Sequence, residues 1–297
     1  MNEFLKNLLS KSPIVLDGAW GTQLQNKGLE PGEIPDIWNL NHPEKVYEVA
    51  KSYIDAGSNI ILTNTFGANK IRLSESQEFS SKVKEINQRG VEISKSAANG
   101  KAYVFASIGP SGKLLMSGDV TEDELFKVFK EQAQTIVEAG ADGIVIETMS
   151  DIEEAVIAVK AAKTTGLPLV ACMVFDSGKA KDRTMMGNTP EECAEKLLDA
   201  GVDIVGSNCG QGIETFLNIC KRLHNASLRQ VWIKPNAGLP TVVDGKAVYK
   251  TTPEEFVRYV PDLINAGAGF IGGCCGTNPE FVIQIRKYCS SYNQIGL

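Results

Sequence analysis

The sequence predicts an α/β fold, a (β/α)8 barrel, with a single domain over residues 1–297. Short apolar segments alternate with helical patterns eight times, the order of elements in a barrel of parallel strands. An Ala-Gly pair recurs where four of the helical patterns give way to a strand. The loops after several strands are also much longer than the turns after helices. An open doubly wound sheet is the alternative, but eight regular units leave no need for a second domain.

The strands are expected at short, largely apolar segments, because both faces of a parallel strand are buried. In chain order they are 14–17, 59–63, 103–108, 143–147, 168–175, 203–208, 231–235 and 269–271.

The helices between these strands have recognisable ends. Thr121 and Glu124 form a capping-box pattern, and Thr189 and Thr252 each precede a proline at the first helical position. The other helices are expected at about 43–56, 79–98, 151–164, 212–225 and 279–291. The Ala-Gly pairs supply glycines for left-handed caps at four helix ends, namely Gly57, Gly140, Gly201 and Gly267.

Four long loops follow strands, at about 18–42, 64–78, 109–120 and 176–188. In a TIM barrel, loops of this kind form the C-terminal face, where the active site lies. We therefore expect the functional residues at that face.

Composition excludes several classes of function. The net charge of −6 and the isoelectric point near 5.2 argue against a nucleic-acid or anionic-membrane partner. The N-terminal residues lack the pattern of a signal peptide, and no apolar stretch is long enough to span a membrane. Seven widely spaced cysteines suit a reducing cytoplasm. Because the chain contains only two histidines, a histidine-rich metal site or a Ser-His-Asp triad is not expected.

Three cysteines stand at strand ends. Cys209 ends the sixth expected strand, and Cys274 and Cys275 follow the eighth between glycines. Adjacent side chains on a regular strand point to opposite faces, so the pair reaches one atom only where glycines let the backbone bend. The three thiols can then converge across the barrel mouth. The other cysteines are expected to be small buried hydrophobes: Cys172, Cys193, Cys220 and Cys289.

Three thiolates match zinc, which favours sulfur ligands in tetrahedral geometry. No fourth cysteine or histidine is placed to join them, which indicates an open coordination position and a catalytic site. Zinc with three thiolates carries a net charge of −1 and is a poor generator of hydroxide. A substrate thiol in the open position would lose its proton and stay electron-rich. Because only the thiolate is nucleophilic, the expected chemistry is alkylation of a bound thiol.

Six stretches in order along the chain carry a family resemblance. They are 17–22, 63–68, 147–149, 208–209, 235–238 and 272–277. In these motifs the chain resembles the homocysteine S-methyltransferase family, which includes betaine–homocysteine methyltransferase and the N-terminal module of cobalamin-dependent methionine synthase. The glycine-flanked cysteine pair with a distant Asn-Cys is the most specific match. The resemblance implies a zinc-dependent (β/α)8 barrel that methylates homocysteine to methionine.

The resemblance also assigns roles to individual residues. Cys209, Cys274 and Cys275 would hold zinc and act in catalysis through it, and Asn236 could contact zinc when substrate is absent. The expected homocysteine-binding residues are Asp17 and Glu147 for the ammonium group, backbone N–H groups near Gly18 and Ala19 for the carboxylate, and Thr63 and Asn64 as secondary contacts. Taken singly, each carboxylate is more simply a strand-end cap or half of a salt bridge.

The methyl donor is expected to be a methylated corrinoid on a separate partner protein that docks on the open barrel face. The eight units leave no room within these residues for a corrinoid-binding domain. Gly67 stands where betaine-dependent relatives carry a tyrosine, and aromatic side chains are what a quaternary ammonium requires. The 235–238 motif also matches the methionine-synthase module. Betaine, S-methylmethionine and S-adenosylmethionine are the alternative donors.

Two hypotheses of other classes remain. Gly272 and Gly273 could form a phosphate site in an aldol-type barrel, with Lys234 as a Schiff-base residue, although this leaves the three cysteines unexplained. A non-catalytic zinc- or thiol-binding module is the second. The 183–187 segment, in the long loop after the fifth expected strand, could meet the donor or be solvated.

Overall fold

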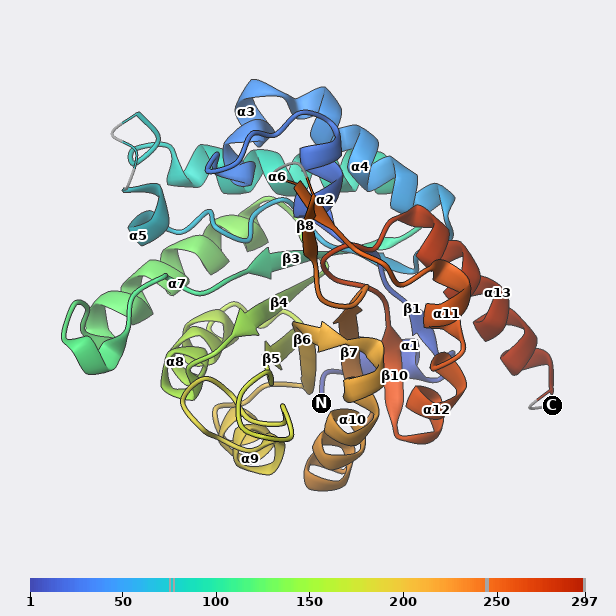
Figure 1. Ribbon diagram of the computed structural model, residues 1–297. Helices are drawn as coiled ribbons and strands as arrows, with labels where there is room; N and C mark the ends of the chain where they lie inside the picture. Colours follow the sequence, from blue (N-terminus) through green and yellow to red (C-terminus); the bar gives the residue numbers. More distant parts are fainter. Residues whose placement is uncertain (75, 77, 244–245, 296–297) are drawn as a thin grey trace.

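The computed structural model describes residues 1–74, 76, 78–243 and 246–295, and these form a nearly closed barrel of eight parallel strands (Figure 1). The strands are β1 (Ile14–Val15), β2 (Ile60–Ile61), β3 (Tyr103–Ile108), β4 (Gly143–Met149), β5 (Leu169–Met173), β6 (Ile204–Gly212), β7 (Val231–Asn236) and β10 (Ala268–Ile271). They are hydrogen-bonded in the order β1-β10-β7-β6-β5-β4-β3-β2. Asn59 joins the two ends of this sheet, since its N–H donates to the Val15 carbonyl at 2.7 Å. The predicted fold class is confirmed.

The helices form an outer ring around these strands (Figure 1). They are α4 (Pro43–Asp55), α6 (Val83–Ala98), α7 (Glu122–Glu138), α8 (Ile152–Lys163), α9 (Pro190–Asp199), α10 (Ile213–Ser227), α11 (Pro253–Val257), α12 (Val260–Asn265) and α13 (Pro279–Ile295). All three predicted N-terminal caps form complete capping boxes, at Thr121, Thr189 and Thr252. The glycines of the Ala-Gly pairs all have positive φ, as the left-handed cap requires.

Several short elements differ from the prediction. The loop expected at 18–42 contains α2 (Trp20–Asn26), the 3-10 turn η1 (Pro35–Ile37) and α3 (Trp38–Asn41). Within the other long loops lie α5 (Lys70–Leu73) and the 3-10 turn η2 (Leu115–Ser117). The helix expected from 79 begins at Val83. A hairpin of β8 (Thr241–Val243) and β9 (Lys246–Val248) follows β7. The helix after Thr252 is divided into α11 and α12 next to Pro261, which has no N–H for a helical hydrogen bond.

The barrel interior is apolar at the N-terminal end and polar at the other. Large buried side chains such as Phe105, Trp232 and Phe270 fill the barrel, and α1 (Glu3–Leu9) closes its floor with Leu5 and Leu8. Inward-pointing residues on a strand recur every second position. The inward residues two positions beyond Phe105, Val145 and Trp232 are the polar Ser107, Glu147 and Lys234. The barrel therefore presents a layer of polar side chains at its C-terminal mouth.

Among the described residues, no helix combines the length and the apolar character needed to cross a bilayer.

Candidate active site

Three thiols meet at the C-terminal mouth of the barrel. Cys209 comes from the end of β6, and Cys274 and Cys275 follow β10. Their sulfur atoms all lie within 4.8 Å of one another. In the part of the chain that the structure describes, this is the only set of three or more His, Cys, Asp or Glu residues gathered closely enough to hold a metal ion. The predicted convergence of these thiols is present in the structure.

The backbone around the cysteines is shaped by close packing. A Cβ atom on Gly273 would lie 2.4 Å from the Thr277 hydroxyl, and one on Gly272 would lie 2.5 Å from the Asp17 carbonyl oxygen. The Cys274 N–H donates to the Pro235 carbonyl at 2.7 Å, which fixes the loop against β7. Cys209 itself adopts a left-handed φ of 64°. Glycines are therefore needed here because the chain is crowded as well as bent.

The pKa values of the three thiols indicate that only one of them ionises readily when no cation is bound. Hydrogen bonds from the Cys274 and Cys275 thiols lower the pKa of Cys209 to about 3. The same coupling to Cys209 raises the pKa of Cys274 to about 11, and that of Cys275 lies far above its ordinary range. One thiolate thus forms readily, while repulsion between like charges opposes the second and third. A bound cation would remove this opposition, so the donor set fits a thiophilic metal ion.

Asn236 lies beside Cys209 and carries a buried side-chain oxygen without a partner in the described part of the chain. Its side-chain N–H donates to the Gly210 carbonyl at 2.8 Å and lies 3.9 Å from the Cys209 sulfur. Its Oδ1 atom is buried and has no hydrogen-bond partner among the described residues. A buried carbonyl oxygen without a partner is costly unless it is satisfied by another group, and a metal ion would satisfy it.

The thiols open into a cavity of about 550 Å³. The predicted substrate residues Gly18, Ala19, Thr63, Asn64 and Glu147 all line this cavity, together with Cys209, Cys274 and Cys275. Asp17 does not line it directly. At the outer end, away from the barrel axis, the wall includes Glu33, Asp36, Phe66 and Arg72.

Asp17 is buried behind the cavity wall and all its contacts are with the protein. Its Oδ2 accepts hydrogen bonds from the Leu62 N–H at 2.7 Å and from the Trp20 indole N–H at 2.8 Å. Its Oδ1 forms an ion pair with the ammonium group of Lys234. Asp17 therefore joins β1, β2 and β7 at the mouth of the barrel.

Glu147 lines the cavity, and one of its two carboxylate oxygens has only a weak hydrogen-bond partner. Its Oε1 accepts a hydrogen bond from the Ser107 hydroxyl at 2.5 Å, whereas the nearest donor to Oε2 is the Asn208 amide at 3.5 Å. Burial raises the pKa of Glu147 to about 7, although the nearby charge of Lys234 opposes the rise. A cationic group placed at Oε2 would hold this carboxylate ionised.

Lys234 is a buried ammonium group, 2% exposed. Burial lowers its pKa, but the Asp17 and Glu147 carboxylates outweigh that effect and hold the pKa above its ordinary value. A Schiff base requires a neutral amine, so this geometry does not suit Lys234 to the aldol-type hypothesis.

The secondary residues have contacts that limit their freedom. The Thr63 hydroxyl accepts from the Ser107 N–H at 3.1 Å, and the Asn64 amide donates to the Pro35 carbonyl at 2.8 Å. The Ala19 N–H already donates to the Thr277 hydroxyl at 3.1 Å. These residues hold the cavity walls in place.

Sequence reasoning missed Ser107 and Asn208, which hold Glu147, and saw Lys234 only as a Schiff-base residue. A signal existed, since Ser107, Glu147 and Lys234 each follow a buried apolar residue by two positions. The 183–187 segment does not line the cavity, and the Arg183 guanidinium instead donates to the Gly187 carbonyl at 2.9 Å. The remaining cysteines are buried, as expected: Cys172, Cys193, Cys220 and Cys289.

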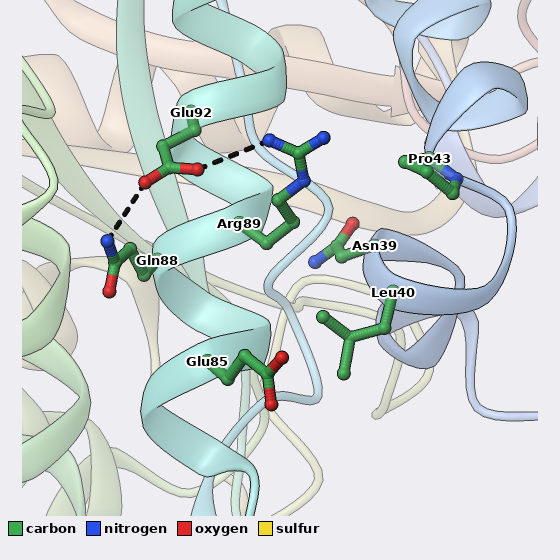
Figure 2. Close-up of a pocket in the computed structure, with 7 residues that line it drawn as sticks. All are labelled: Asn39, Leu40, Pro43, Glu85, Gln88, Arg89 and Glu92. Carbon is green, nitrogen blue, oxygen red and sulfur yellow. Dashed lines mark hydrogen bonds and ion pairs between the residues drawn. The ribbon is translucent and has the colours of Figure 1, made fainter.

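A separate hollow of about 410 Å³ lies on the outer surface between α6 and the turn from α3 to α4. Figure 2 shows Glu92 bonded to Gln88 and Arg89 on α6, with Arg89 on the side toward Asn39, Leu40 and Pro43. It belongs to the helical shell and contains no thiol, so it is not part of the site at the barrel mouth.

Two kinds of related protein can be aligned with this chain over most of its length. It is 28% identical to the methionine synthase of Mycobacterium leprae (strain TN) over 97% of this chain and 25% of the relative. It is 27% identical to betaine–homocysteine S-methyltransferase 1 of Rattus norvegicus over 95% of this chain and 74% of the relative. The chain spans about a quarter of the length of the methionine synthases that it matches.

A solved structure agrees in fold over nearly the whole chain. The metallated form of the homocysteine methyltransferase MmuM from Escherichia coli superposes with a TM-score of 0.80, at 21% identity, over 96% of this chain and 99% of that one. The family model for homocysteine S-methyltransferases matches residues 14–289, which include the three clustered cysteines. The chain therefore belongs to the homocysteine S-methyltransferase family.

Proposed function

We propose that this chain is a zinc-dependent homocysteine S-methyltransferase that receives its methyl group from a methylated corrinoid carried by a separate protein. The observation that carries the proposal is the meeting of three thiols and a buried carboxylate, Glu147, in one cavity. Family membership supports the acceptor and the reaction class.

The metal is assigned from the donor set. Cys209, Cys274 and Cys275 would hold zinc, and Asn236, whose buried Oδ1 has no partner among the described residues, would contact the metal when no substrate is present. When bound, zinc supplies a Lewis acid that lowers the pKa of a substrate thiol while the sulfur ligands keep that thiol electron-rich.

The protein groups around the cavity orient homocysteine. Glu147 receives the ammonium group at Oε2, and Asp17, ion-paired with Lys234 behind the wall, supports the strands around it. The turn at Gly18 and Ala19 forms the wall at the carboxylate end, with Thr63 and Asn64 as further contacts. A charged partner suits the ammonium group because an ion removed from water needs compensating charge.

The outer end of the cavity favours the corrinoid over betaine. A Cβ atom on Gly67 would lie 2.8 Å from Asp36 Oδ2, and Asp36 accepts a hydrogen bond from the Gly67 N–H at 2.9 Å. An aromatic side chain at position 67 would require this carboxylate to move, so in the present packing position 67 adds no aromatic group to Trp20 and Phe66, which line the cavity.

A donor panel tests this proposal. The purified, zinc-loaded protein is incubated with homocysteine and, in separate reactions, methylcobalamin, betaine, S-methylmethionine or S-adenosylmethionine, and methionine is quantified by mass spectrometry. Slow turnover with free methylcobalamin and none with betaine is expected. Efficient turnover with betaine or S-methylmethionine, and none with methylcobalamin or a methylated corrinoid protein, would reject the corrinoid. Zinc and homocysteine binding without turnover on any donor would favour the non-catalytic thiol-binding module.

A further inference from the structure

Three buried charged groups lie together at the barrel mouth, and of these Glu147 and Lys234 line the cavity whereas Asp17 lies behind its wall. Asp17, Glu147 and Lys234 are 0%, 8% and 2% exposed, respectively. Two carboxylates and one ammonium group leave a single net negative charge, which matches one substrate ammonium group. Removal of the lysine charge would leave two buried carboxylates to share one cation.

The two carboxylates differ in how many of their oxygens are already bound by the protein. Asp17 uses Oδ2 for two N–H donors and Oδ1 for Lys234, so both its oxygens are occupied. Glu147 retains Oε2, whose nearest donor lies 3.5 Å away. Lys234 is therefore paired with Asp17, and Glu147 is the carboxylate that keeps an oxygen available in the cavity.

The ion pair also reaches the cavity wall. The oxygen of Asp17 opposite Lys234 holds the Trp20 indole and the Leu62 N–H, and Trp20 follows the turn at Gly18 and Ala19. A change at Lys234 would thus be transmitted through Asp17 to the wall where the proposed carboxylate end of homocysteine lies.

We infer that Lys234 is a positioning residue for homocysteine: it engages Asp17, fixes the 18–20 wall and reserves Glu147 for the substrate ammonium group. This inference rests on the proposed function and deepens its account of substrate recognition. Lys234 acts through Asp17 and Glu147 and needs no contact with the reacting sulfur.

The test compares Lys234→Met, Asp17→Asn and the double variant Lys234→Met/Asp17→Asn. The Leu62 N–H and the Trp20 indole both bond to Oδ2 of Asp17. An asparagine at position 17 can accept both hydrogen bonds with its one side-chain oxygen, and its NH2 group then points toward the side chain at position 234. The double variant therefore removes both charges and preserves both hydrogen bonds. Removing one member of a buried ion pair is strongly destabilising, whereas replacing both is often close to neutral.

Homocysteine dissociation constants and zinc content are measured for each variant. Each single variant should weaken homocysteine binding roughly 10–100-fold, because it leaves a buried charged group without its partner. The double variant should recover at least part of this loss and zinc content should stay at one per chain. Ethanethiol, which lacks both charged groups, is the matched ligand, and its affinity should be the same in all four proteins.

The outcomes separate the inference from the proposed function. Wild-type affinity in Lys234→Met would overturn the inference, as would a double variant no better than the product of the two single effects. If a single variant fails to fold, the double variant still decides, because the ion-pair account requires it to fold and bind. An equal loss of ethanethiol affinity would show a general structural defect and also reject the inference. A wild-type protein that does not bind homocysteine would overturn the proposed function together with it.

Discussion

Alanine at Cys209, Cys274 or Cys275 should abolish methyl transfer and leave the protein with little bound zinc. Each substitution removes one of the three clustered sulfur donors, and Asn236 offers only a neutral oxygen in compensation. Structural zinc in zinc-finger peptides binds with about 10–16 kcal/mol when all ligands are present, so the loss of one of three thiolates should be a large effect. Zinc is measured by inductively coupled plasma mass spectrometry after gel filtration, and activity with the donor that supports wild-type turnover.

Cys193→Ala is the matched control for these variants. Cys193 is fully buried on α9 and is not one of the residues that line the cavity. Its replacement should cost about 1 kcal/mol of stability through lost packing and leave zinc content unchanged. Full zinc occupancy in all three variants of the cluster would show that the metal assignment is wrong.

Glu147→Gln should weaken homocysteine binding by about 1–3 kcal/mol without loss of zinc, because a neutral amide cannot compensate the substrate ammonium group. Because Glu147 is proposed to contact only the ammonium group of homocysteine, 4-carbon thiols without an amino group should bind the wild type and the variant with equal affinity. Isothermal titration calorimetry with homocysteine and with 4-mercaptobutanoate measures both. Equal wild-type affinity for these two ligands would contradict the role of Glu147.

The pH dependence gives a second measure of the same residue. Burial raises the pKa of Glu147 to about 7, so in the free protein the carboxyl group is neutral below this pH and ionised above it. Homocysteine binds the ionised form, so affinity should fall about tenfold per pH unit below 7 on account of this group. Glu147→Gln removes the part of the pH dependence that is due to this carboxyl group and keeps the part that is due to ionisation of the homocysteine thiol. Parallel pH profiles for the two proteins would exclude ionised Glu147 as the ammonium partner.

The barrel could be predicted because local signals repeat along the chain. The capping boxes at Thr121, Thr189 and Thr252 and the glycines after the helices specify helix ends without reference to distant residues. The elements that were missed lack such repetition. The floor helix α1 has only Leu5 and Leu8 as buried anchors, and the β8–β9 hairpin is not part of the repeating unit.

The thiol cluster could be predicted because its members stand at strand ends, which a barrel brings to one face. The electrostatic partners could not, because they depend on distances across the barrel. Asp17 and Lys234 are far apart in sequence, and only the curvature of the sheet brings β1 and β7 close enough for an ion pair. The packing of Gly67 against Asp36 likewise joins two loops that the sequence does not relate.

X-ray absorption at the zinc edge tests the central claim most directly, since it counts the sulfur atoms around the metal before and after homocysteine is added. The account predicts three sulfur ligands and one lighter ligand in the free protein, and four sulfur ligands with homocysteine bound. A sulfur count that stays at three in the presence of saturating homocysteine would contradict activation of the substrate thiol at this site.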